Sequence, residues 1–145
     1  MLARNRKQGF TLVEILIVVV ILGILAAIVI PQFTNASESA RASSLISQLQ
    51  TIRSQLELYQ VQHGGSYPDL SANWDAMTVA GGGYGPYLQQ APKNPFESNS
   101  TTTADAAAAG VGWEYDSTNG TIRAVMSSAK ATELGLDTTN DVATY

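Results

Sequence analysis

Residues 10–33 decide the fold, and they read FTLVEILIVVVILGILAAIVIPQF. Only Thr11, Glu14 and Gln32 are clearly polar in this stretch, and residues 15–30 carry no polar side chain at all. As an α-helix, the stretch would be about 36 Å long, which is enough to cross the roughly 30 Å hydrocarbon core of a bilayer. We therefore expect a membrane-spanning helix.

Charge is distributed unevenly along the 145 residues. Arg4, Arg6 and Lys7 give the first nine residues a charge of +3, so the rest of the chain carries −7 of the total of −4. Basic residues stay on the cytoplasmic side of a membrane, which predicts a cytoplasmic N-terminus and an exported C-terminal region. The acidic remainder argues against nucleic acid as the main ligand. The absence of cysteine excludes disulfides, zinc thiolate sites and a thiol nucleophile.

Glu14 distinguishes this segment from a simple anchor or a disposable signal. A secretory signal would be cut after small residues, and Ala26 and Ala27 could mimic such a site. A carboxylate inside an apolar span is costly to insert, however, and a discarded signal has no use for it. We expect Glu14 to have a charged partner.

The N-terminal motif resembles that of type IV pilins and type II secretion pseudopilins. Gly9 is followed by FTLVE at residues 10–14, after a short basic leader and before a long apolar helix. The resemblance implies that a prepilin peptidase removes the leader, residues 1–9, between Gly9 and Phe10 and N-methylates Phe10. It also implies that Glu14 neutralises the α-amino group of Phe10 on an adjacent subunit during assembly. Pro31 matches the family's helix-kinking proline, and its missing N–H independently predicts a bend.

This resemblance implies a filament subunit of the inner membrane with no enzymatic activity. The implied partners are the prepilin peptidase, further copies of the chain, minor pseudopilins or pilins, an assembly platform protein and, through it, an ATPase. Residues 67–70 and 92–96, together with the lack of cysteine, favour the major pseudopilin of type II secretion, whose periplasmic pseudopilus drives protein export. The alternative is a major type IV pilin of surface fibres for adhesion, motility or DNA uptake.

Two other classes of protein are less consistent with the sequence. An anchored DNA-uptake receptor should have a basic exposed region, whereas the chain after Gly9 is acidic. An anchored hydrolase should have a convergent polar site, and His63, the only histidine, lies in no recognisable nucleophile motif.

The helix is expected to continue through residues 34–63 as an amphipathic helix. Its apolar stripe recurs at spacings of four and three residues, which is typical of a helix packed on a globular region. The stripe consists of Leu45, Leu49, Ile52, Leu56 and Tyr59. Gly64 can adopt the left-handed cap conformation, so the helix is expected to end at His63.

Residues 64–145 are expected to form a globular region with a β-hairpin at about 111–127, which makes the chain an α+β protein. Asn119-Gly120 suggests a two-residue turn that places Asp116 opposite Arg123 and Trp113 opposite Met126. In that register Trp113 lies on the buried face and the Asp116–Arg123 pair is exposed. The pilin resemblance implies a small antiparallel sheet packed on the helix, and the other large aromatics, including Trp74, are expected to anchor loops.

The last residues, 132–145, show no further strand-like alternation. The resemblance implies a calcium site in a C-terminal loop, and Asp137, Asn140 and Asp141 supply oxygen ligands of the right chemistry. Their spacing matches no calcium-loop motif, so solvated loop residues are the favoured interpretation. No other cofactor is expected.

Overall fold

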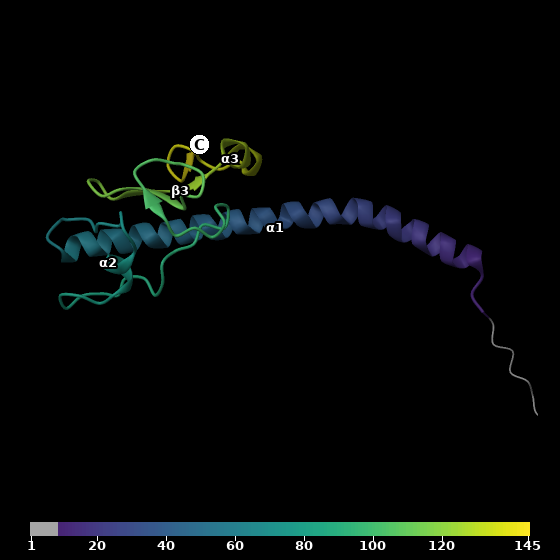
Figure 1. Cartoon of the computed structure of the whole chain (residues 1–145), viewed down its shortest axis with the longest axis horizontal. Coiled ribbons are helices and arrows are strands. Elements are labelled where there is room, and N and C mark those ends of the chain that lie inside the picture. The colour runs from purple at the N-terminus through teal and green to yellow at the C-terminus, as the bar shows by residue number, and fades with distance from the viewer. Residues whose placement is uncertain (1–8) are drawn as a thin grey trace, which may run out of the picture. The chain divides into compact units, whose positions relative to one another are not determined.

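A computed structural model describes residues 9–145 (Figure 1). The chain divides after Glu38 into two parts. We call residues 9–38 the N-terminal segment and Ser39–Tyr145 the head. One helix, α1 (Leu12–Gln62), contributes to both parts.

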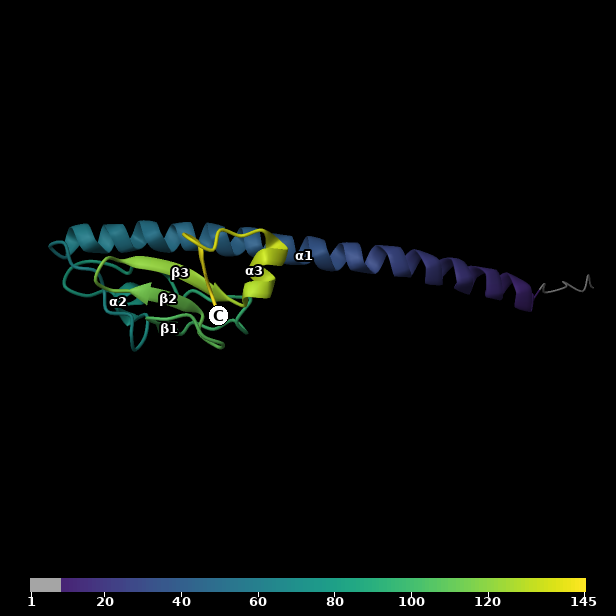
Figure 2. The same cartoon turned by 90° about the horizontal axis from the view of Figure 1, so that it is seen from above.

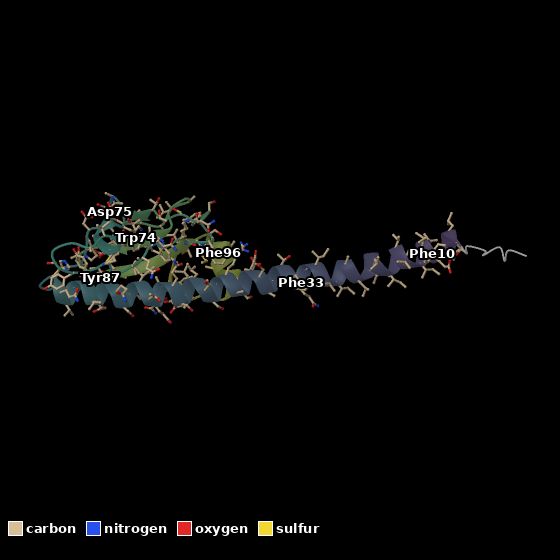
Figure 3. The ribbon with its side chains drawn as sticks, turned by 90° about the horizontal axis from the view of Figure 1, so that it is seen from below. Phe10, Phe33, Trp74, Asp75, Tyr87 and Phe96 are labelled. Carbon is tan, nitrogen blue, oxygen red and sulfur yellow. The ribbon has the colours of Figure 1, made fainter. Side chains whose placement is uncertain are left out.

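The N-terminal segment is helical from Leu12 onward and has no side chain buried within the described chain. Its large apolar residues are all at least 42% exposed, and Figure 3 shows Phe10 and Phe33 projecting from the backbone. α1 is long and apolar enough to cross a membrane, as the sequence predicts. The helix continues through Pro31 without a break, and the bend expected there remains a prediction.

The head contains the remaining elements. Two are short helices, α2 (Asp75–Thr78) and α3 (Ser128–Leu134). Four are strands in the spatial order β1-β2-β3-β4, namely β1 (Thr103–Ala104), β2 (Trp113–Asp116), β3 (Thr121–Met126) and β4 (Val142–Thr144). Figure 2 shows β3 beside the C-terminal half of α1, with β2 and then β1 farther away.

The sheet is mixed. β2 and β3 form the predicted antiparallel hairpin, but β1 pairs with β2 and β4 pairs with β3 in parallel. The expectation of an antiparallel sheet therefore holds only for the central pair. Residues 132–145 show no strand-like alternation in the sequence but do contain β4, a three-residue strand whose side chains are too few to show alternation.

The hairpin register also differs from the predicted one. Trp113 lies opposite Ala124, and Arg123 lies opposite Glu114 rather than Asp116. The loop has four residues instead of two, because the Asp116 carboxylate accepts the N–H of Thr118 and the Asp116 carbonyl accepts that of Gly120. Since the shift is two residues, the faces are preserved and Trp113 is still buried.

The core of the head packs the apolar stripe of α1 against the sheet. Leu45, Leu49, Ile52 and Leu56 are buried as predicted, and Tyr59 packs against them. Trp74, which was expected to anchor a loop, lies just before α2 and is buried in this core, with its ring edge-on to Trp113 at 6.4 Å between centroids. Its indole N–H donates to the carbonyl of Thr101, which explains how a polar aromatic side chain can be buried here.

Buried polar contacts tie the loops to the sheet. Asn94 is completely buried, and its amide donates to the carbonyls of Gly112 and Val125 while its oxygen accepts the N–H of Phe96. α1 ends at Gln62, where Gly64 and Gly65 adopt the positive φ angles that end a helix.

Candidate functional site

The Gly9–Phe10 peptide bond lies outside α1. Both residues are exposed, and the helix begins two residues after Phe10. A Cβ atom added to Gly9 would meet no heavy atom within 4 Å, so nothing in the described chain covers this bond. The leader charges Arg4, Arg6 and Lys7 lie outside the described residues.

Glu14 and Thr11 form a capping box at the start of α1. The Glu14 carboxylate accepts the Thr11 N–H at 2.7 Å and the Thr11 hydroxyl at 2.9 Å, and the Glu14 N–H donates back to that hydroxyl at 3.2 Å. These bonds satisfy backbone donors that a helix N-terminus otherwise leaves unpaired. The sequence contained this signal in the Thr-x-x-Glu spacing of residues 11–14, but the structural role was missed.

The apolar surface that follows Glu14 has no partner within the described chain. It surrounds the helix on all sides rather than along one stripe, and each of its large side chains is about half exposed or more over residues 12–28. Such a surface is stable only in a bilayer or against other apolar chains. The buried part of α1 begins only at Ala42.

His63 lies where α1 ends and is engaged with neighbouring aromatic rings. Its ring stacks on Tyr59 at 3.8 Å between centroids, and Nδ1 lies 3.0 Å from the Tyr59 carbonyl oxygen. The structure thus gives His63 a role in packing the end of the helix against Tyr84 and Tyr87.

The residues considered for calcium belong to a short loop, Asp137–Asp141, which we call the C-terminal loop. Asp137 accepts N–H groups from Thr139 and Asn140 and from the Asn140 side chain. The Asn140 amide and these backbone groups lower the pKa of the Asp137 carboxyl below its ordinary value. Asp141 instead forms a 2.8 Å ion pair with Arg53 of α1.

As arranged in the structure, these residues do not fit a calcium site. Calcium requires six to eight oxygen ligands. The oxygens of Asp137 already receive hydrogen bonds, and the Asp141 carboxylate faces a guanidinium. In the part of the chain that the structure describes, no three acidic or histidine side chains are grouped as metal ligands would be. Arg53 could not be recognised as a partner of Asp141 from local sequence, because the two residues are 88 positions apart.

The family described as "Prokaryotic N-terminal methylation motif" matches residues 4–30, which include Gly9, Phe10 and Glu14. No solved structure gives a significant match.

Curated proteins extend the similarity into the head. The chain is 30% identical over 103 residues to the type II secretion system core protein G of Klebsiella pneumoniae, covering 66% of this chain and 73% of that protein. This chain belongs to the core protein G family. The core protein G of Aeromonas hydrophila is 31% identical over 106 residues, which cover 65% of this chain and 73% of that protein. The core protein G of Dickeya chrysanthemi reaches 40% identity, but over only 50% of this chain and 47% of its own length.

Proposed function

We propose that this chain is the structural subunit of a type II secretion pseudopilus. The observation that carries the proposal is the fully apolar surface of α1 between residues 15 and 30, preceded by a single carboxylate at Glu14. Membership of the core protein G family supports it. The role is structural rather than enzymatic, since packing such helices together builds a filament without any chemical step.

The proposed precursor is a single-pass protein of the inner membrane with its N-terminus in the cytoplasm and its head exported. Arg4, Arg6 and Lys7 would hold the leader on the cytoplasmic side. A prepilin peptidase then cuts between Gly9 and Phe10 and methylates the new α-amino group. Extraction from the bilayer requires work, which a platform protein and its ATPase would supply, and minor pseudopilins would join the same filament.

Glu14 is proposed to act between subunits as well as within its own helix. Cleavage places a positive α-amino group at Phe10, which would lie among apolar helices in the filament core. An unpaired charge in such a core is unfavourable, and breaking a buried ion pair costs about 3 to 5 kcal/mol. A Glu14 carboxylate on the neighbouring subunit would provide the counter-charge and favour one stagger of the helices.

The capping box suggests how to separate these two roles of Glu14. Glu14→Gln keeps an oxygen that can accept the Thr11 N–H but removes the charge, whereas Thr11→Val removes the hydroxyl and keeps the carboxylate. Each variant is expressed in a strain lacking the wild-type copy. Processed protein in the inner membrane is measured by mass spectrometry, and filaments are counted by electron microscopy.

Both variants should be inserted and cleaved after Gly9, since neither changes the leader. We expect Glu14→Gln to lose filaments and Thr11→Val to retain most of them. Filaments at wild-type number in Glu14→Gln would show that the charge is unnecessary, and loss in Thr11→Val alone would assign Glu14 a capping role only.

The secretion role is tested by deleting the gene and measuring both the proteins secreted into the culture supernatant and the surface fibres. The proposal expects loss of secreted proteins from the culture supernatant without loss of surface fibres. Loss of surface fibres with normal secretion would instead indicate a type IV pilin.

A further inference from the structure

Arg53 connects three separate segments of the head through its guanidinium group. Nη1 donates to the Asp141 carboxylate at 2.8 Å, and Nη2 donates to the Ile122 carbonyl at 3.0 Å and to the Asn140 carbonyl. Its side chain is 35% exposed and that of Asp141 is 28% exposed. One cation therefore links α1 to β3 and to the C-terminal loop.

Arg123 reinforces this arrangement from β3. It forms a bidentate pair with the Glu114 carboxylate at 2.8 and 2.9 Å and reaches the Thr139 carbonyl at 3.5 Å. The carbonyls of Thr139 and Asn140 and the carboxylate of Asp141 thus all face guanidinium groups. Three successive residues of the loop turn their oxygens toward positive charge.

The C-terminal loop in turn positions the last strand. The Asp137 carbonyl accepts the N–H groups of Asp141 and Val142, and the Asp141 carbonyl accepts that of Ala124 in β3. Val142, which begins β4, is completely buried in the core. Holding the loop closed therefore determines whether β4 can pair with β3.

Backbone carbonyls and a carboxylate converging on one point are the ligands that calcium collects in proteins. Here a guanidinium receives them, and it also supplies the positive charge that offsets Asp141. We infer that Arg53 takes the place of a divalent cation in the head, so that the C-terminal loop closes and β4 pairs without metal. Closure of the C-terminal loop by Arg53 does not require filament assembly.

The test uses the full chain in detergent micelles, with and without a calcium chelator. Hydrogen exchange is measured at the amides of Ala124 and Val142, which the closed loop protects. Unfolding of the head is followed by tryptophan fluorescence, because Trp74 and Trp113 both lie in its core. For the wild type, we expect the same exchange rates and the same urea midpoint in excess calcium and in chelator.

Arg53→Met keeps an apolar stem and removes the charge. Because hydrogen bonds to charged groups are stronger than those between neutral groups, this change should speed exchange at the Ala124 and Val142 amides by at least about tenfold. Arg41→Met is the matched control, because Arg41 is an exposed arginine on the same helix, and it should leave the rates unchanged. Arg53→Lys retains the charge with less directional donors and should give an intermediate rate.

Two results would overturn the inference. One is loss of exchange protection at the Ala124 and Val142 amides of the wild type in chelator, with recovery in calcium. This measurement does not require any variant to fold. The other is wild-type exchange in Arg53→Met. If Arg53→Met unfolds, the amide exchange rates of Arg53→Lys are compared with those of Arg41→Met instead. Equal exchange rates in these two variants count against a role for the Arg53 guanidinium.

Discussion

Replacing Trp113 with alanine tests the packing of the head most directly. Trp113, the first residue of β2, is completely buried in the core, its indole N–H donates to the Pro92 carbonyl at 3.1 Å, and its ring contacts Trp74. Removing a buried tryptophan costs about 3 to 5 kcal/mol through lost contacts and the cavity that remains. That is a large part of the roughly 5 to 15 kcal/mol of stability of a typical domain.

Urea titration of the full chain in detergent measures this loss of stability. Unfolding is followed by the fluorescence of Trp74, which every variant retains. With a slope of about 1 to 3 kcal/mol per molar urea, the midpoint should fall by roughly 1 to 5 M. Asp116→Ala on the same strand is the control. Asp116 is exposed and accepts one N–H in the turn, so this change should cost about 1 kcal/mol or less. A larger loss of stability in Asp116→Ala than in Trp113→Ala would refute this packing of Trp113.

Two further predictions concern close contacts of the hairpin and are checked by the same titration. Gly120→Ala should destabilise the head by well over about 1 kcal/mol, because φ is +71° and the new Cβ would lie 2.2 Å from the Tyr67 ring. Gly110→Ala is the control, because Gly110 has a similar φ of +82° but open space around it, and it should cost only about 1 to 2 kcal/mol. Equal losses of stability in the two variants would contradict the close approach of Gly120 to Tyr67. Burial raises the pKa of the Tyr115 hydroxyl, which donates to the Pro68 carbonyl. The protonated form is favoured in the folded state, so its contribution is complete below the ordinary tyrosine pKa of about 10 and is lost as the pH rises above it. Tyr115→Phe should therefore be less stable at neutral pH and should lose less stability than the wild type in alkali, and parallel pH profiles would contradict this.

Local periodicity was sufficient to predict much of the fold. The stripe from Leu45 to Leu56 and the buried face of Trp113 depend on spacings of a few residues, which determine the face of a helix or strand directly. The shifted register shows the limit of this reasoning. The Asp116 carboxylate accepts an N–H within the turn, and the loop is two residues longer than predicted. A two-residue shift leaves every side chain on the same face, so the alternation of apolar residues cannot reveal it.

Features built from distant segments could not be predicted. α3 has seven residues and β4 has three, so neither has a clear period of its own, and both are stabilised by tertiary contacts. Asn94 resembles any polar loop residue until Gly112 and Val125 are placed beside it. Arg53 likewise has no sequence signal for its role, because its partners lie 69 to 88 residues away. For the N-terminal site, by contrast, the Thr11–Glu14 spacing contained the capping signal.

The joining of α1 to the last strand in one core has a consequence for the order of events during synthesis. Leu45 and Val142 belong to the same buried cluster, so the core of the head cannot be completed until β4 has been made. At about 5 to 20 residues per second, the ribosome needs roughly 5 to 20 s to add the residues between them. During this interval the stripe of α1 has no sheet to cover it. The core of the head therefore stays incomplete until β4 has been made and can pair with β3.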